Sequence, residues 1–415
     1  MANEIEQPAT KERSAGEAEL RVKHAEAEKP LRHVTLLVES STTWGSDIVQ
    51  GIADYANDHA NWVIYYEPRG KYEVLHLPDD WRGDGVIARV TTESLGDQIV
   101  AAKVPAVNVS WHAYHGGLIP RCTTSERLSA EMIAQHFLDR GFRRFAYFGD
   151  CRRAKHADLF GSAFIEIIEQ SGFVCHKHPC VTRNVKEGAP TRQEQLELME
   201  WVQQLPKPIA LLAFNDVRGR QVVEACRQSG IAVPDDIAVM GGEHDKLASQ
   251  MSRPRLSSID LSSHRVGFEA AKLLDRMMAG KQPPTDPILI PPARILVHAS
   301  TDTLAVEDEL VSQALHFIAA QLHRPINVKH ILEHVPTSRR VLEQRFRDLL
   351  GRAPAEEIRR ARIERTKRLL AETDKSLRQI ARDCGFLHAE VLSRVFRRTE
   401  GITPSEYRKR VRTAD

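Results

Sequence analysis

The stretch from Ser376 to Arg408 constrains the fold more than any other part of the chain. Ser376 and Gln379 have the spacing of a capping box, in which each side chain satisfies an unpaired amide at a helix start. An apolar face follows, and Gly385 can adopt the positive φ that ends a helix. A second helical pattern begins a few residues later, with Leu392 facing inward. Two short helices joined by a glycine turn predict a helix-turn-helix, whose second helix can enter a DNA major groove.

The same pattern occurs a second time, about 50 residues earlier in the chain. Asn327 can cap one helix and Ser338 the next. The tetrapeptide GRAP at 351–354 resembles GITP at 401–404, and residues 356–370 between the units form a long helical pattern rich in arginine. Two reading helices joined by a linker helix could contact successive major-groove faces, about 34 Å apart.

The side chains expected to contact bases lie opposite the apolar faces. Leu342, Phe346 and Leu349 are expected to face inward in the earlier unit. Arginine can read guanine, glutamine reads adenine, and glutamate accepts from cytosine. The predicted DNA-contacting residues are Ser338, Arg339, Arg340, Glu343, Gln344 and Arg347 in the first unit and His388, Glu390, Ser393, Arg394 and Arg397 in the second. The connecting helix carries arginines expected to contact phosphates or remain solvated, namely Arg359, Arg360, Arg362, Arg365 and Arg368.

These motifs resemble those of the AraC family of transcription regulators. The resemblance is carried by Ile380-Ala381, Gly385-Phe386, Phe396-Arg397 and the run from Gly401 to Arg408. Leu392 stands where the family usually has an aromatic residue, a change that a volume-tolerant core can accept. The resemblance implies an all-α DNA-binding domain with two helix-turn-helix units, for which we expect the bounds 309–415.

The distribution of charge agrees with this interpretation. Of 58 Lys+Arg and 56 Asp+Glu in the chain, residues 309–415 hold 23 and 14, so the remainder holds 35 and 42. A basic C-terminal part on an acidic body predicts local attraction to phosphates. A merely solvated helical face would give the same charge balance, so the motifs have to decide between the two.

From Arg32 onward, short β-branched runs alternate with helical patterns. Alternation over roughly 270 residues predicts an α/β fold with parallel sheets, and two successive series predict two lobes. In such folds, ligands bind outside the carboxyl ends of the strands. Strands are expected at 34–38, 63–66, 85–88, 106–109, 145–148, 210–214 and 237–240, and helices at 46–60, 126–140, 160–172 and 217–229.

This body resembles the periplasmic-binding-protein-like sensor of the LacI family. The resemblance is carried by Phe214-Asn215-Asp216, the run from Pro234 to Gly241, and Leu256 to Ile259. It implies a following helix at 264–278 and a closing strand at 291–295. A sensor domain followed by an AraC-type DNA-binding domain, called the reader below, is the order of the xylose operon regulators. The chain resembles these regulators from residue 32 to residue 412.

The resemblance implies a cytoplasmic, sugar-responsive transcription regulator that acts as a homodimer, with a periplasmic-binding-protein-like sensor of two α/β lobes followed by the all-α reader. The expected partners are double-stranded promoter DNA, a small sugar effector (xylose or another pentose) and, for an activator, RNA polymerase. Sugar binding is expected to close the lobes and reorient the reader. The expected domains are a flexible charged tail at 1–30, the sensor at 31–297, a linker at 298–308 and the reader at 309–415.

A sugar site needs hydrogen-bonding side chains and an aromatic face for the C–H surface of the ring. Candidates near strand ends are Glu39, Trp44, Arg69, Arg89, Asn108, Ser125, Asn215, Asp216, Glu243 and His244. Glu243 stands where such sensors commonly have aspartate, and Ser125-Glu126 replaces a usual Asp-Asn pair. Each of these residues could equally be a cap or turn residue.

Other classes of protein find less support in the sequence. No apolar run reaches about 18 residues, and residues 1–30 lack the apolar core of a signal peptide. Six scattered cysteines fit a reducing compartment. The group from Cys175 to Cys180 has the residue types of a metal site, but it lacks a second pair of ligands and is crowded for one tetrahedron, so a structural role is preferred. No catalytic motif or cofactor fingerprint appears. The alternatives are a carbohydrate-binding protein or a carbohydrate-active enzyme with a non-functional reader.

Overall fold

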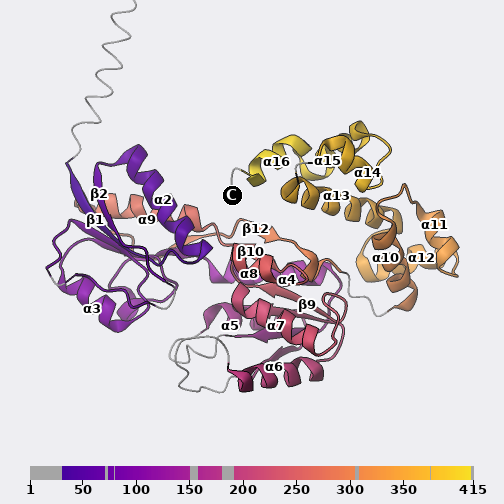
Figure 1. Cartoon of the computed structure of the whole chain (residues 1–415), viewed down its shortest axis with the longest axis horizontal. Helices are drawn as coiled ribbons and strands as arrows, with labels where there is room; N and C mark the ends of the chain where they lie inside the picture. The colour runs from indigo at the N-terminus through magenta and orange to yellow at the C-terminus, as the bar shows by residue number, and fades with distance from the viewer. Residues whose placement is uncertain are drawn as a thin grey trace, which may run out of the picture. The chain divides into compact units, whose positions relative to one another are not determined.

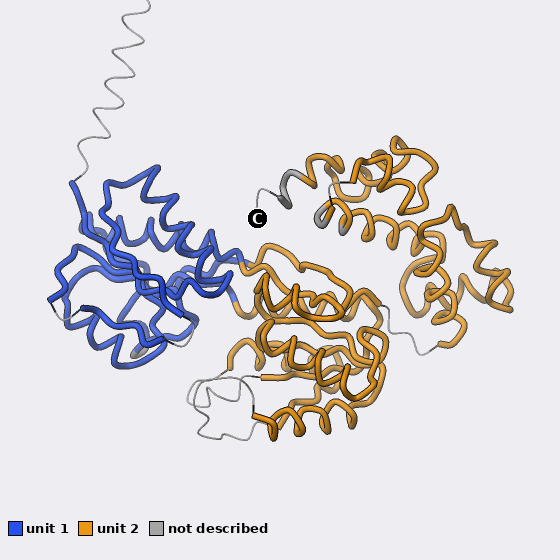
Figure 2. The backbone as a smooth tube through the Cα atoms, viewed as in Figure 1, with its two compact units in different colours: residues 1–125, 262–291 blue, residues 126–261, 292–415 orange. Residues whose placement is uncertain are grey.

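The computed structural model describes residues 30–70, 73–78, 80–149, 158–179, 191–303, 308–373 and 375–412. These residues form two compact units (Figure 2). The first contains the described residues up to Ser125 together with Ser262–Pro291, and the second contains Glu126–Leu261 and the described residues from Pro292 onward. The tail predicted at 1–30 lies, except for Pro30, outside the described residues, and so does Cys180.

The first unit is built on a parallel sheet with the strand order β2-β1-β3-β4. Its strands are β1 (Arg32–Leu37), β2 (Trp62–Tyr66), β3 (Gly85–Ala88) and β4 (Ala106–Asn108), and a separate parallel pair joins β5 (Cys122–Thr124) to β11 (Ile288–Ile290). The helices are α2 (Thr43–His59), α3 (Glu93–Ala101), α9 (Ser263–Met278) and a 3-10 turn, η1 (Tyr114–Gly117). The four expected strands and the first expected helix are confirmed, with ends shifted by up to three residues.

Helix α9 returns to the first unit from far along the chain and packs against α2 (Figure 1). Glycines allow this close approach. A Cβ atom on Gly51 would lie 1.9 Å from the carbonyl oxygen of His264, and one on Gly267 would lie 2.0 Å from that of Ile48. The two series of elements therefore do not correspond to two consecutive lobes, since residues 262–291 belong to the first unit.

The sensor part of the second unit has a six-stranded sheet with the order β12-β10-β9-β8-β6-β7. The strands are β6 (Phe145–Phe148), β7 (Cys175–Lys177), β8 (Ile209–Ala213), β9 (Ile237–Gly241), β10 (Ser257–Asp260) and β12 (Arg294–Leu296). The helices are α4 (Glu126–Asp139), α5 (Leu159–Gln170), α6 (Arg192–Gln204), α7 (Asp216–Gln228) and α8 (Lys246–Met251). All of the pairings are parallel except that β12 runs antiparallel to β10, so the expectation of a parallel sheet holds for all but the last strand.

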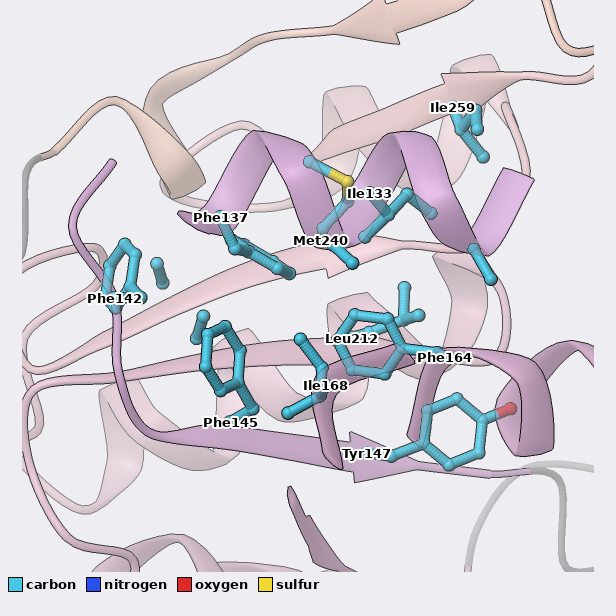
Figure 3. Packing of buried hydrophobic residues seen from close by; sticks show 14 of the residues in the cluster. Ile133, Phe137, Phe142, Phe145, Tyr147, Phe164, Ile168, Leu212, Met240 and Ile259 are labelled. Carbon is cyan, nitrogen blue, oxygen red and sulfur yellow. The ribbon is translucent and has the colours of Figure 1, made fainter. Parts of the chain in front are cut away.

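The sheet of the second unit is buried on both faces. On one face, Ile133 and Phe137 from α4 and Phe164 from α5 pack over Phe145 and Met240 of the strands (Figure 3). On the other face, α6 and α7 supply a second cluster of buried residues. Burying one such side chain contributes about 1.5–3 kcal/mol, so the two clusters fix the strand order and the positions of the strand ends.

The chain leaves this sheet later than the sequence predicts. A 3-10 turn, η3 (Ala299–Thr301), lies within the expected linker, yet Ser300 and Thr301 are fully buried. The Ser300 hydroxyl donates to the carbonyl of Val239 at 2.6 Å and accepts from the amide of Ser257 at 2.8 Å. Residues 298–301 therefore belong to the sensor, because the His298 backbone and the hydroxyl groups of Ser300 and Thr301 hydrogen-bond to Ser257 at the start of β10.

The reader is all-α. Its helices are α10 (Glu309–Gln321), α11 (Val328–His334), α12 (Arg339–Leu350), α13 (Pro354–Glu372), α14 (Leu377–Asp383), α15 (Ala389–Glu400) and α16 (Pro404–Arg412). Asn327, Ser338 and Ser376 cap helices as predicted, and Gly385 has the expected positive φ of 67°. Leu349 is a correction: it is 40% exposed, because the core of the first helix-turn-helix closes over Leu342 and Phe346 without it.

Candidate nucleic-acid interface and sugar site

Helix α12 buries one face and exposes the face predicted to read DNA. Leu342 and Phe346 are fully buried. Ser338, Arg339, Arg340, Gln344 and Arg347 are exposed, and Glu343 is half-buried. The carboxylate of Glu343 accepts from Arg339 at 2.8 Å and lies 3.7 Å from Arg347, while Gln344 donates to Asp348 at 2.8 Å. These partners are all on the helix surface, so each side chain can exchange them for base edges.

Helix α15 has the same division of faces. Leu392 and Phe396 are fully buried, which confirms the predicted inward position of Leu392. The residues predicted to contact DNA from this helix, His388, Glu390, Arg394 and Arg397, are exposed, whereas Ser393 is half-buried. The hydroxyl of Ser393 donates to the carbonyl of Ala389 at 2.9 Å, so it is partly engaged within its own helix.

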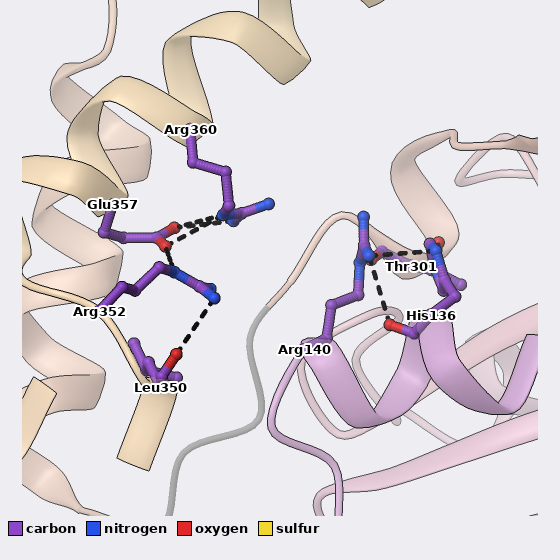
Figure 4. Close-up of polar contacts among 7 residues, drawn as sticks. All are labelled: His136, Arg140, Thr301, Leu350, Arg352, Glu357 and Arg360. Atoms are coloured by element: carbon purple, nitrogen blue, oxygen red, sulfur yellow. Dashed lines mark hydrogen bonds and ion pairs between the residues drawn. The ribbon is translucent and has the colours of Figure 1, made fainter. Parts of the chain in front are cut away.

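The arginines of α13 do not all serve the role that the sequence suggested. Arg359 is exposed and remains a candidate for phosphate contact. Arg360 instead pairs at 2.7 Å with Glu357, a carboxylate that is 1% exposed and also accepts from Arg352 at 2.5 Å (Figure 4). Arg362 donates to backbone carbonyls of the α10–α11 turn. The prediction of phosphate contact or solvation was therefore wrong for Arg360 and Arg362, because both side chains bind groups of the protein itself.

In the first unit, three of the predicted sugar residues lie together at the carboxyl ends of the strands. Glu39 follows β1 and Arg89 follows β3, and the two form a buried ion pair. The guanidinium of Arg89 lies 4.6 Å from the ring centre of Trp44 and 5.2 Å from that of Trp111. A buried acid–base pair with two indole rings offers a donor, an acceptor and apolar faces to a polyhydroxylated ring.

The other predicted residues of the first unit have different surroundings. Asn108 accepts from the amides of Val90 (3.2 Å) and Ser110 (2.8 Å) and donates to the carbonyl of His112 (2.8 Å), so its side chain holds the loop after β4. Arg69 pairs with Glu67 at 2.5 Å and lines a small separate pocket. The amide of Ser125 donates to the carbonyl of Ile290 at 2.8 Å.

In the second unit, Asp216 and His244 meet at Ser258 of β10. Asp216 is fully buried and accepts from the Asp245 amide at 2.9 Å and from the Ser258 hydroxyl. The Nδ1 atom of His244 lies 3.3 Å from the Ser258 oxygen. Burial raises the pKa of Asp216 well above its usual value, and hydrogen bonding by the Asp245 amide opposes that shift. Asn215 caps α7 through the Arg218 amide at 2.9 Å.

Several residues of this region were missed by sequence reasoning. Ser257 and Ser258 form the buried hydrogen bonds described above, and the Thr301 hydroxyl donates to Ser257 at 2.7 Å. His136 of α4 and Arg140, which directly follows that helix, both contact Thr301 (Figure 4). No residue-type pattern distinguishes such serines and threonines from surface ones, and only their burial marks them. Glu243, predicted as a ligand residue, is 8% exposed in the loop after β9.

The described residues contain no helix long and apolar enough to cross a membrane. They also contain no group of three or more His, Cys, Asp or Glu side chains arranged to hold a metal ion.

Three family profiles match the chain. Residues 33–117 match the XylR N-terminal domain, residues 134–301 match a periplasmic binding protein-like domain, and residues 331–410 match a helix-turn-helix domain. The second match ends at Thr301, in agreement with the buried turn at the end of the sensor.

The similarity to known proteins extends over most of the chain. Two relatives named xylose operon regulatory protein, from Haemophilus influenzae and Escherichia coli K12, are each 29% identical to it over 381 and 386 residues. These alignments cover 90% and 91% of this chain and 97% of each relative. A solved structure described as xylose-binding transcription activator xylR matches with 27% identity and a TM-score of 0.61, over 92% of this chain and 98% of that one. A LacI family regulator from Bifidobacterium animalis, 15% identical with a TM-score of 0.51, shares the sensor fold.

The fold, the exposed faces of α12 and α15 and these matches define a class. The chain is a DNA-binding transcription regulator, and not an enzyme, in which a periplasmic-binding-protein-like sensor precedes an AraC-type helix-turn-helix reader. Within that class its similarity, over nearly the full chain, is to the xylose operon regulators.

Proposed function

We propose that this regulator activates pentose-utilisation genes when it binds xylose or a closely related sugar. The observation that carries the proposal is the buried Glu39–Arg89 pair beside Trp44 and Trp111, at the strand ends where this fold binds ligands. The full-length similarity to a structure described as a xylose-binding transcription activator supports the same effector. In this proposal the regulator works in the cytoplasm as a homodimer and recruits RNA polymerase at the promoter.

The chemistry of the Glu39–Arg89 group suits a neutral polyol. A carboxylate accepts hydrogen bonds from sugar hydroxyl groups and a guanidinium donates to them. Hydrogen bonds to the sugar can therefore replace some of those between Glu39 and Arg89. The indole faces can cover the C–H surface of the ring. An anionic sugar phosphate would instead meet the charge of Glu39, which disfavours that class of ligand.

The effect of sugar binding has to pass through the sensor part of the second unit to affect the reader, and hydrogen bonds of β10 connect the two. Ser258 contacts Asp216 and His244 on one face of the strand. Its neighbour Ser257 accepts from the Thr301 hydroxyl at 2.7 Å on the other face. Thr301 is the last residue of η3, just before the reader begins. A sugar that favours one position of β10 therefore also favours one position of this junction, as linkage requires.

Binding of sugars to the full chain can be measured by thermal unfolding against a panel of pentoses and hexoses. A sugar present at 100 times its Kd stabilises the folded state by about 2.7 kcal/mol, so the true effector raises the melting temperature. We expect xylose to do so, and Trp111→Leu to weaken the effect while keeping the Glu39–Arg89 pair intact. Glu67→Gln, which changes an exposed carboxylate, is the matched control. No shift with any pentose would contradict the proposed effector.

The DNA contacts are tested separately, on promoter fragments selected by the full chain. Gln344→Ala should relax the base preference at one position of the selected site, because glutamine reads adenine. Arg359→Ala should weaken binding to all sequences and reduce the salt slope by about 1, because it removes one phosphate contact. If both variants lost affinity equally on specific and random duplexes, the assignment of the recognition face would be wrong.

A further inference from the structure

Helix α13 is shared by the two helix-turn-helix units, and each unit has a core of its own. Ile358 of this helix belongs to the buried cluster of the first helix-turn-helix unit (α11 and α12), with Leu342 and Phe346. Ile363 belongs to the buried cluster of the second helix-turn-helix unit (α14 and α15), with Leu392. In this subsection, the first and second units are these two helix-turn-helix units. The two clusters have no buried residue in common, so each unit can retain its fold while the angle between them changes.

Arg362 lies on α13 at the point where one core gives way to the other. Its Nη2 atom donates to the carbonyl oxygens of Arg324 at 3.0 Å and Ile326 at 3.1 Å, both in the turn between α10 and α11 of the first unit. The same guanidinium lies 5.6 Å from the ring centre of Phe386, which follows the turn of the second unit. One side chain thus contacts the turns of both units.

Gly385 makes a second contact at the same place. A Cβ atom on Gly385 would lie 2.3 Å from the carbonyl oxygen of Arg324 and 2.6 Å from that of Leu322. Only glycine allows the second turn to approach the first this closely. Gly351 and Gly401 end α12 and α15 with similar positive φ angles, yet a Cβ on either would meet nothing within 4 Å. The close approach at Gly385 is therefore a property of the junction and not of helix ends in general.

We propose that Arg362 and Gly385 are positioning residues that set the spacing at which the two recognition helices read DNA. They touch no base. They hold the turn of the first unit against the turn of the second, and so fix α12 relative to α15. The operator consequently consists of two short elements at one preferred separation. The inference rests on the DNA-binding function and adds to it the determinant of the spacing.

The preference for one separation arises from the effective concentration of the second helix-turn-helix unit at its site once the first unit is bound. A rigid junction presents the second helix at the correct groove position and nowhere else, so it favours one spacing and penalises others. Inserting one base pair displaces the second element by about 3.4 Å and rotates it by roughly a tenth of a turn, which removes several base contacts. A loosened junction lowers affinity at the preferred spacing and tolerates its neighbours.

The test uses the full chain. Duplexes are selected from a random pool, the two elements are assigned by the positions that Gln344→Ala and Arg394→Ala relax, and one base pair is then inserted or deleted between them. For the unchanged protein we expect the Kd to rise by about tenfold or more on insertion. For Arg362→Met, which retains an apolar stem of similar length, we expect the rise to stay within about threefold.

Two matched controls separate positioning from other effects. Arg359→Met removes an exposed arginine of the same helix and should weaken binding by one factor at every spacing. Gly385→Ala should widen the spacing tolerance as Arg362→Met does, whereas Gly351→Ala, with the same unfavourable φ but open space around it, should not. If Arg362→Met fails to fold, Gly385→Ala measured against Gly351→Ala still decides the matter.

Unchanged spacing preference in both Arg362→Met and Gly385→Ala would overturn the proposal, as would an equal loss at all spacings. If the unchanged protein selected only single-element sites, the role of the junction would be refuted while DNA binding stood. If it selected no sequence at all, the proposed DNA contacts would fail together with this inference.

Discussion

Thr301→Val tests the hydrogen bonds that tie the end of the sensor to its sheet. The guanidinium of Arg140 has only donors and lies 3.0 Å from Nδ1 of His136, so Nδ1 is an acceptor and the ring proton is on Nε2. Nε2 then donates to the Thr301 hydroxyl at 3.2 Å, and that hydroxyl donates to Ser257 at 2.7 Å. The chain of donors ends at the His298 carbonyl, 3.0 Å from the Ser257 oxygen.

Valine has nearly the shape of threonine, so the substitution removes the hydroxyl and leaves the packing. The Nε2 proton of His136 loses its acceptor inside the protein, and an unsatisfied buried donor costs about 1–3 kcal/mol. The lost bond to Ser257 adds roughly 1 kcal/mol. The variant should therefore be destabilised by about 2–4 kcal/mol, or on the order of 5–15 °C in Tm for a domain of this size.

The measurement is thermal and urea unfolding of the full chain, followed by the transition of the sensor. Thr303→Val is the control, because its hydroxyl donates to Asp235 at 3.2 Å at the surface and its loss should change the stability by less than about 0.5 kcal/mol. Equal stability of the two variants would refute the reasoning. If β10 carries the sugar signal, Thr301→Val should also reduce the change in DNA affinity on adding sugar.

Three further outcomes follow from particular contacts. Glu357→Gln should destabilise the reader by about 2–4 kcal/mol, because two half-buried arginines lose the buried carboxylate that they share. The exposed neighbour change Glu356→Gln should cost less than about 1–2 kcal/mol. Burial and the charge of Arg140 hold the pKa of His136 well below its usual value, so the folded state favours the neutral ring. The free energy of unfolding should therefore fall as the pH drops below about 6.5, by up to about 1.4 kcal/mol per pH unit. Urea titrations at several pH values should show a shallower fall for His136→Gln. Gly51→Ala should unfold the first unit at a lower temperature in a calorimetric scan, since a Cβ there would lie 1.9 Å from the carbonyl oxygen of His264.

The reader shows how far local sequence signals extend. Asn327, Ser338 and Ser376 were identified as caps from sequence and act as caps in the structure, because a capping hydrogen bond joins residues two or three apart. The exposed faces of α12 and α15 follow from helical periodicity in the same way. Leu349 was misjudged, since periodicity places a residue on a face but does not say how far the neighbouring helix extends to cover it.

In the sensor, the elements were predictable and their assembly was not. The strands that precede Glu39 and Arg89 could be expected from their composition, but the pairing of these side chains depends on β1 and β3 lying side by side. Asn108 was an equally good candidate ligand residue, yet its side chain hydrogen-bonds to the loops that follow β3 and β4. The polar residue type was informative, and its partners decided between binding and structure.

The sequence by itself determined the helices and strands, the two reading units and the basic character of the reader, because caps, periodicity and charge depend on residues close together in the chain. Only the tertiary structure decided that α9 completes the first unit, that Thr301 ends the sensor and that Arg362 joins the two readers. The partners of Arg362 are carbonyl groups 36 and 38 residues away. Every residue has such a carbonyl, so no sequence pattern marks the ones that an arginine will meet.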